Sequence, residues 1–349
     1  MNRYPTRFLI FAKSKLGWAI YCRQSLIVAS ITVALLSVGA APALAQITWQ
    51  MSTEYPQTNI SGVGLTTFAK FVSSQTDGFV TAKTSFNNEL KISSGEMVRA
   101  AQDGRIAGGD AFAGPLAASD AIFGLASLPF VVQSIDAAQA VNTRARPLYE
   151  KALEADGLKL LYITVWPATG LWSDRPLNKI DDLVTLAVRT YDYTSAEVFR
   201  ATGARAEYLP FNEAIAKLKD HMLNAVLTSG DGGAGQRLWD YLHYFSPINY
   251  AVPISLTFVR MDAFQSLPKA VQEQVMAAAA ETEKSQFDLL ANRTAENYAR
   301  MKANGVIIAE PTPVAIIATL RQAAAGPIAA WKAKVPAEAV AIVDWASQR

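Results

Sequence analysis

Arg189 stands at the end of an apolar run and is followed at alternate positions by Tyr191 and Tyr193. The run LVTLAVRTYDY has the composition of a buried strand, and side chains two residues apart share one face of a strand. An arginine at the carboxyl end of a parallel strand lies where open α/β sheets bind ligands, and its planar guanidinium can hold a carboxylate by two hydrogen bonds. If the strand continues, the pattern predicts a small-anion site.

A purely structural interpretation of the same residues is also open. The two tyrosines can pack at the edge of a strand, and the arginine can form an ion pair with an acid nearby in the sequence. The three candidate acids are Asp181, Asp182 and Asp192.

Residues able to perform catalysis are scarce. After residue 45 the chain has two histidines, His221 and His243, and no cysteine. Both histidines have the setting of surface or helix-end positions, and no metalloprotease, nucleophile-elbow or dinucleotide motif occurs. The stretch SGDGGAG, residues 229–235, lacks the Lys-Ser/Thr pair of a phosphate loop, and we interpret it as a flexible turn with backbone donors available to a ligand. We expect no enzyme activity, no metal and no cofactor.

The first 45 residues have the pattern of a cleavable signal peptide. Five basic residues precede the apolar run LIVASITVALLSVGAAPALA, and no acidic residue occurs before Glu54. Ala43 and Ala45 are the small residues of a cleavage site, which predicts cleavage before Gln46 and a periplasmic product. The alternative is an N-terminal membrane anchor.

Removal of this segment changes the charge of the protein. It takes away five of 32 basic residues and none of the 30 acidic ones, which leaves 27 against 30 and a net charge of about −3. A surface without basic excess argues against nucleic acid as a partner. The only cysteine, Cys22, also lies in the leader, so the mature chain can form no disulfide.

The order of predicted elements indicates an α/β fold with two lobes. Strands and helices alternate from ITWQMST to AGGDAFA, which favours a largely parallel sheet, and the alternation restarts after the apolar strand LKLLYITVW. A second long strand, YAVPISLTFVR, leads back to the first lobe. Two such crossings predict a hinge. The expected organisation is lobe I at 46–165 plus 256–305, lobe II at 166–255, and a C-terminal strand with helices at 306–349.

A long helix is predicted from Pro268 to about Asn304. The segment has no internal proline or glycine, begins with proline and ends at Gly305. At 1.5 Å per residue it would be roughly 50 Å long, enough to span both lobes. A coiled-coil dimer is the rival use of such a helix, but the heptad pattern is not sustained, so a monomer is the expectation.

Several segments, in the same order and spacing, resemble a known family: the solute-binding proteins of tripartite ATP-independent periplasmic (TRAP) transporters, DctP type. The segments that carry the likeness are GEMVRAAQDGRIAGGDAFAGPLA, LASLPFVV, RPLNKIDDLVTLAVRT, ATGARAEYLPFNEAIAKL and SLPKAVQEQVMAAAAETEK. The likeness covers essentially all of the mature chain. It implies a two-lobed periplasmic-binding-protein-like fold with hinge strands and a long helix across both lobes.

The resemblance also implies a set of binding residues. Arg189 occupies the place of the arginine that forms the salt bridge to a ligand carboxylate. The other implied positions are Trp166, Tyr191, Phe211, Ser229 or neighbouring Thr228, Phe112 and Ser52. Core or hinge packing is the alternative role for Trp166, Phe211 and Phe112.

Two departures from the family pattern bear on the ligand. Leu171 stands where many members carry a second arginine, and His221 and Asn224 replace the Gly and Asp of a family turn.

The function expected from the resemblance is the capture of an organic acid anion and its delivery to a TRAP membrane permease. Lobe closure would follow from ligand contacts that are made by both lobes. The alternatives are a periplasmic sensor that presents a bound carboxylate to a membrane kinase, and an enzyme.

Overall fold

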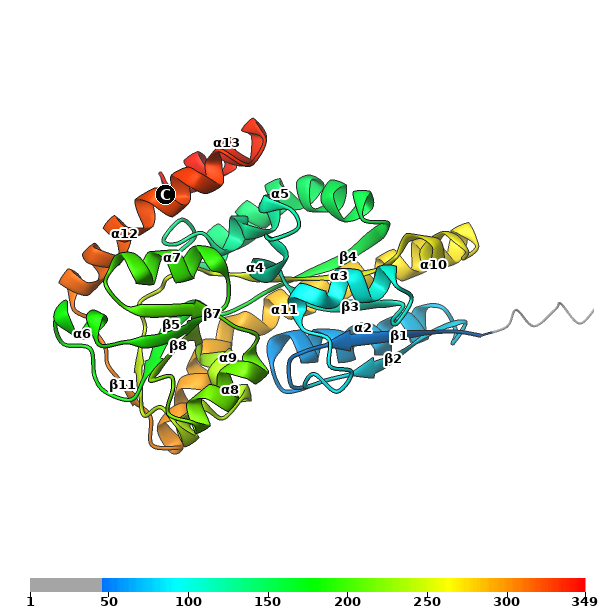
Figure 1. Cartoon of the computed structure of the whole chain (residues 1–349). Helices are drawn as coiled ribbons and strands as arrows, with labels where there is room; N and C mark the ends of the chain where they lie inside the picture. Colours follow the sequence, from blue (N-terminus) through cyan, green and yellow to red (C-terminus); the bar gives the residue numbers. More distant parts are fainter. Residues whose placement is uncertain (1–45, 349) are drawn as a thin grey trace, which may run out of the picture. The chain divides into compact units, whose positions relative to one another are not determined.

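Two successive β-α-β passes of the chain build two separate sheets (Figure 1). A computed structural model describes residues 46–348, so the predicted leader and its cleavage site lie outside the described residues. Within 46–348 the first sheet has five strands in the order β2-β1-β3-β10-β4, and we call it and its helices lobe I. Its strands are β1 Ile47–Thr53, β2 Val80–Ser85, β3 Gly108–Phe112, β4 Leu158–Val165 and β10 Ile254–Arg260.

The second sheet, with its helices, forms lobe II. Its strand order is β11-β9-β5-β8-β6-β7. The strands are β5 Thr169–Ser173, β6 Ala187–Thr190, β7 Arg205–Tyr208, β8 Ala225–Ser229, β9 Tyr244–Ser246 and β11 Ile307–Ile308. In both sheets the strands of the β-α-β pass run parallel, whereas β10 in lobe I and β5 in lobe II pair antiparallel with their neighbours. The predicted two-lobed α/β fold is confirmed.

The chain crosses three times between the sheets, and the first two crossings lie side by side. β4 ends at Val165 and β5 begins at Thr169, while the return segment joins β9 to β10. Trp166 N donates to Pro253 O at 2.9 Å, and Thr169 N donates to Ala251 O at 2.8 Å. The predicted crossing strands therefore end at the lobe boundary, where backbone hydrogen bonds hold the two connections together.

Helices connect the strands and cover the sheets. In lobe I they are α2 Ile60–Gln75, α3 Ser94–Gln102, α4 Ala113–Leu116, η1 Ala121–Ser127, α5 Ile135–Ala155 and α10 Met261–Gln265. In lobe II they are α6 Asp181–Val184, α7 Tyr193–Ala201, α8 Phe211–Lys219, α9 Gly230–Gly235 and η2 Leu238–Asp240. Large apolar side chains fill the space beneath them, including Trp49 and Phe68 in lobe I and Trp172 and Phe245 in lobe II, each 2 % exposed or less. Each sheet is therefore supported by its own packed core.

The predicted long helix is α11, Lys269–Ala303, with Pro268 at its N-cap. It packs on α2 and β4 of lobe I and, further along, on α9 and β11 of lobe II. Figure 1 shows it passing, yellow to orange, from one sheet to the other. Its buried positions include Val275, Ala278 and Ala279, whose small side chains allow close approach to its neighbours. The helix therefore spans both lobes, as the sequence predicts.

Two helices at the C-terminus complete the described chain. They are α12 Val314–Lys332, which packs on α7, and α13 Ala337–Ala346, which packs on α5. Among the described residues α12 alone has the length and mean hydropathy, 1.2, to cross a membrane. Ile316, Leu320 and Ala324 form a buried stripe along it, and Trp331 Nε1 donates to Ala121 O at 2.6 Å. These contacts are those of a helix packed on the body of a protein.

The expectation of a flexible turn at SGDGGAG is wrong. Residues 230–235 form α9, with Gly230 to Ala234 buried. Ser229 Oγ accepts a hydrogen bond from Gly232 N at 3.1 Å and so caps the helix. A Cβ on Gly233 would lie 2.2 Å from the Trp172 ring, so a glycine is required there by close packing. His221 and His243 are both exposed, as predicted.

Candidate ligand-binding site

A small cavity lies where the ends of strands from both sheets meet the first two crossings. Half of its lining residues are aromatic, and the lining carries one cation and five hydroxyl groups, two of them on tyrosines. The lining residues are Tyr55, Phe112, Trp166, Thr169, Arg189, Tyr191, Phe211, Thr228, Ser229 and Pro253.

Arg189, near the end of β6, is the charged residue of this lining. It is 4 % exposed, its Nε donates to Leu209 O at 2.8 Å, and its guanidinium carbon lies 4.7 Å from the centroid of the Phe211 ring. Among the described residues no hydrogen bond or ion pair occupies its two terminal nitrogens. One bond and one ring therefore orient the guanidinium, and its two terminal donors stay available to an anion in the cavity.

The three acids that could have neutralised Arg189 are used elsewhere. Asp182 accepts from the backbone of Asn178 at 2.7 Å, and Asp181 is exposed. Asp192 caps α7, where Ser195 N donates to its Oδ1 at 2.7 Å. Because none of them forms an ion pair with Arg189, the structure does not contain the salt bridge that the structural interpretation required.

Burial raises the pKa of the acids that lie near Arg189. Desolvation raises the pKa of Asp192 to about 6. It also raises the pKa of Glu54, although Ser94 N donates to that carboxylate at 3.1 Å and the charge of Arg189 acts in the opposite direction. The pKa of Arg189 is itself lowered by desolvation. Because burial disfavours the Arg189 charge, an incoming carboxylate beside the guanidinium would compensate it.

Aromatic rings from both lobes meet in the cavity wall. Tyr55 and Phe112, from lobe I, lie with ring centroids 4.7 and 6.0 Å from that of Trp166, and Phe112 lies 5.1 Å from Tyr191 of lobe II. Trp166 Nε1 donates to Ser255 Oγ at 2.9 Å, which fixes the indole. The rings form a flat, apolar enclosure beside the cation.

Two buried hydroxyl groups of the lining have no hydrogen-bond partner in the protein other than each other. They are Thr169 Oγ1 and the hydroxyl of Tyr191. A hydroxyl can donate one hydrogen bond and accept two, so the pair can still contact a bound molecule.

The structure brings together most of the residues that the sequence indicated: Arg189, Trp166, Tyr191, Phe211, Thr228, Ser229 and Phe112. Ser52 does not line the cavity, because it lies within β1, where it pairs with Ser85 and Gly109 and is 1 % exposed. Tyr193 does not share a strand face with Arg189, since β6 ends at Thr190 and α7 begins at Tyr193. Its ring, 60 % exposed, packs on Tyr208 at 4.8 Å.

Three lining residues were not indicated by the sequence. Tyr55 follows the end of β1, so the tendency of ligand sites to form at the carboxyl ends of strands is the signal that could have found it. Thr169 and Pro253 come from the crossings, and no sequence pattern marks them.

A wider groove lies elsewhere in lobe I, between α5 and α11. Its charged residues already pair with one another: Arg146 with Glu283, and Lys284 with Asp288 at 2.6 Å. It offers no unpaired cation, so it is a poorer anion site than the smaller cavity.

Two lobes joined by three crossings of the chain, with a cavity between them that holds a cation without an ion pair among the described residues, define a ligand-binding protein of the periplasmic-binding-protein class. The chain belongs to the family described as bacterial extracellular solute-binding protein, family 7 (DctP), whose family model matches residues 51–331. The resemblance noted from the sequence is thereby confirmed. A search of curated proteins gave no match.

Solved structures give the same architecture. DctP7 of Bordetella pertussis, an extracytoplasmic solute receptor binding pyroglutamic acid, is 26% identical with a TM-score of 0.82, covering 86% of this chain and 99% of its own. A marine metagenome TRAP solute-binding protein specific for pyroglutamate is 23% identical, with a TM-score of 0.82 and coverages of 87% and 100%. A TRAP solute-binding protein from Sulfitobacter sp. NAS-14.1 with bound β-D-galacturonate is 18% identical, with a TM-score of 0.78 and coverages of 86% and 100%.

Proposed function

We propose that this solute-binding protein captures a small organic acid anion between its lobes and delivers it to a TRAP membrane permease. The observation that carries the proposal is Arg189, a buried cation in the cavity without an ion pair among the described residues. A carboxylate is the anion whose geometry matches the two free guanidinium nitrogens.

The other lining residues receive complementary roles in this proposal. Phe211 holds the guanidinium plane, while Trp166, Phe112 and Tyr191 enclose the body of the ligand. The hydroxyls of Thr228 and Ser229 bind polar atoms of the ligand from lobe II. Because the enclosing residues come from both lobes, the ligand stabilises the closed arrangement more than the open one.

The ligand class that fits best is a small monocarboxylate with a flat, largely apolar body, such as L-pyroglutamate. The cavity holds one arginine, and Leu171, where many relatives have a second, is fully buried in β5. Five aromatic rings line the cavity, and these flat apolar walls favour a planar ring over a polyhydroxylated sugar acid. The most identical of the three structures described above binds pyroglutamic acid.

A thermal-shift panel on the mature protein tests this proposal. The panel contains L-pyroglutamate, D-galacturonate, succinate and 2-pyrrolidinone, the last being the pyroglutamate ring without its carboxylate. A ligand at 100 times its dissociation constant adds roughly 2.7 kcal/mol of stability. We expect L-pyroglutamate to give the largest shift and 2-pyrrolidinone none. A response to 2-pyrrolidinone as large as that to L-pyroglutamate would show that the carboxylate is not what the site recognises.

The remaining features of the protein follow from the same proposal. The mature chain begins near Gln46 in the periplasm, lobe I comprises 46–165 with 256–305, and lobe II comprises 166–255. The segment that follows from residue 306 adds β11 to the lobe II sheet and packs its helices on the body. Uptake of the ligand into vesicles that contain the neighbouring permease subunits, dependent on added binding protein, tests delivery directly. Ligand-dependent kinase activation without uptake would favour a sensor instead.

A further inference from the structure

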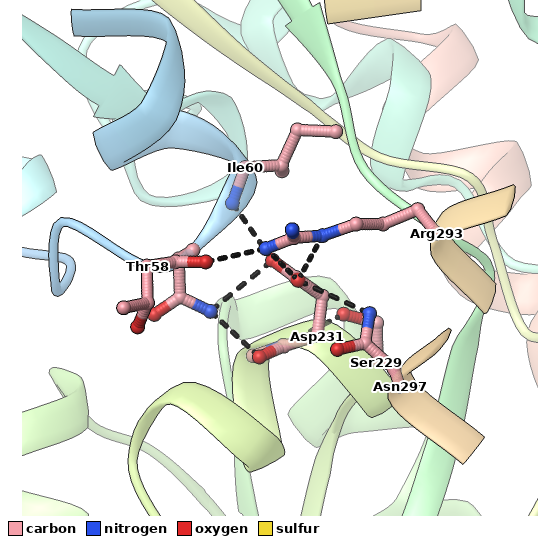
Figure 2. A network of polar contacts seen from close by, with 8 residues as sticks. Thr58, Ile60, Ser229, Asp231, Arg293 and Asn297 are labelled. Atoms are coloured by element: carbon pink, nitrogen blue, oxygen red, sulfur yellow. Dashed lines mark hydrogen bonds and ion pairs between the residues drawn. The ribbon is translucent and has the colours of Figure 1, made fainter. Parts of the chain in front are cut away.

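Asp231 of lobe II joins three parts of the molecule that are distant in sequence (Figure 2). Its side chain is 1 % exposed. Its carboxylate accepts hydrogen bonds from Ile60 N at 2.9 Å and Asn59 Nδ2 at 3.1 Å, both from lobe I. It also accepts from Arg293 Nε at 2.6 Å and Asn297 Nδ2 at 3.1 Å, both from α11. The cost of burying this carboxylate is offset by its four donors, and it is fully offset only while α9, the N-terminus of α2 and α11 stay together.

The lobe I side of this network is the N-terminus of α2. Asn59 is the N-cap residue of that helix, yet its side chain makes no capping bond to its own helix. It donates instead to Asp231 O at 2.6 Å and to Asp231 Oδ2. The carboxylate of Asp231 takes the capping role by accepting from Ile60 N, and α2 has no acid in its own first turn. An acid from one lobe therefore caps a helix of the other and meets the positive end of its dipole.

The α11 side of the network fixes the orientation of the carboxylate. Arg293 forms an ion pair with Asp231 and also donates to Thr58 O beside the α2 terminus. Asn297 lies against Gly230 of lobe II. Donors from α11 thus contact one oxygen of the Asp231 carboxylate, and donors from the N-terminus of α2 contact the other.

The network is also connected to the proposed ligand site. Ser229, which lines the cavity, caps α9 through Gly232, and Asp231 is the second residue of that helix. The lobes meet closely here, since a Cβ on Gly235 would lie 2.0 Å from Asn59 Oδ1. A ligand contact at Ser229 and the inter-lobe contact at Asp231 therefore depend on the same short helix.

We propose that Asp231 is a positioning residue that fastens the closed cleft by engaging Asn59 and Ile60, and so sets the affinity for the ligand. The inference rests on the proposed binding function. Opening the lobes removes the α2 donors from a buried carboxylate, while the α11 donors remain. Because the contact uses only residues of this chain, it favours the closed state with or without a ligand. If the ligand binds the closed state, the apparent dissociation constant rises by the same factor by which the closed fraction falls.

The test uses Asn59→Ala, with Asn297→Ala as the matched control. Asn59→Ala removes inter-lobe bonds to Asp231 and no capping bond of α2, whereas Asn297→Ala removes a bond to the same carboxylate from α11. Since the mature chain has no cysteine, spin labels at Lys83→Cys in β2 and Lys219→Cys in α8, both exposed positions, report the distance between lobes.

We expect the wild-type distance distribution to contain a component from the closed state. Asn59→Ala should reduce this component both without ligand and with 1 mM L-pyroglutamate. Asn297→Ala should leave it unchanged. The dissociation constant for L-pyroglutamate should rise about 3- to 10-fold in Asn59→Ala, mainly through faster dissociation. Unchanged distances in Asn59→Ala, an equal effect of Asn297→Ala, or a wild type without a closed component would each overturn the proposal. If L-pyroglutamate leaves the wild-type distances and the melting temperature unaltered, the ligand class fails separately, and the distances without it still decide the role of Asp231.

Discussion

The guanidinium carbon of Arg189 lies 4.7 Å from the centroid of the Phe211 ring. The ring comes from the first residue of α8 and the arginine from β6, so two different elements of lobe II fix one cation. Arg189 Nε is held by Leu209 O, just before α8. The cation is therefore oriented before a ligand arrives, which lowers the entropy cost of binding.

The ring of Phe211 should contribute to affinity through this contact. Phe211→Leu keeps an apolar side chain but removes the π face, so we expect binding to weaken by about 0.5–2 kcal/mol. Isothermal titration calorimetry with L-pyroglutamate measures it. Phe264→Leu in α10, a buried phenylalanine of lobe I away from the cavity, is the control and should lower stability without changing affinity. Equal affinity losses in the two variants would mean that the effect is general destabilisation.

The hydroxyl of Tyr191 should matter for binding and not for folding. Its one polar partner in the protein is the Thr169 hydroxyl, so Tyr191→Phe removes a single hydrogen bond between two lining residues from the unliganded state. We expect a nearly unchanged melting temperature and a loss of about 0.5–1.5 kcal/mol in binding. Tyr149→Phe, whose buried hydroxyl is unpaired and lies outside the cavity, should leave affinity unaltered. Unaltered affinity in Tyr191→Phe would show that the ligand does not reach this hydroxyl.

Asp110 should make stability depend on pH in a direction unusual for a carboxylate. Burial raises its pKa from 3.8 to about 6, even though Thr53 and Thr257 hydroxyls each donate to it at 3.1 Å. A raised pKa in the folded state stabilises the fold below the unfolded pKa, and this contribution is lost as pH rises through the folded pKa. The wild type should therefore lose on the order of 1–3 kcal/mol relative to Asp110→Asn between pH of about 4 and 7.

Urea unfolding of both proteins across that pH range measures this difference. A constant difference, or one that favours the wild type as pH rises, would show that Asp110 is ionised in the fold without cost.

The sequence predicts those parts of the site that depend on local patterns. β6 and its arginine are recognisable because an apolar run leads into a charge, and α11 because thirty-five residues contain no proline or glycine. The turn between β6 and α7 is not recognisable from alternation alone. Asp192 caps the helix there, so the chain bends and carries Tyr193 away from the site.

Features that depend on the contact between lobes could not be predicted. Asn59 and Asp231 are 172 residues apart, and neither has a local pattern that indicates the other. The glycines of α9 suggested flexibility, whereas in the structure Gly233 and Gly235 permit close packing against Trp172 and Asn59. Such roles follow from the relative placement of elements, which a single sequence does not report.

The most direct test of the account is the affinity and the unliganded melting temperature of Arg189→Ala and Arg189→Lys, measured on the same preparations. If the guanidinium binds the ligand carboxylate, Arg189→Ala should cost about 2–5 kcal/mol of binding, and Arg189→Lys nearly as much because a single ammonium cannot form the paired bonds. The unliganded melting temperature should fall only modestly, since Arg189 forms no ion pair among the described residues and burial disfavours its charge. The stability lost is that of one hydrogen bond to Leu209 O and of the contact with the Phe211 ring. Retained affinity together with a lowered melting temperature would contradict the account, because Arg189 would then stabilise the fold and not the ligand.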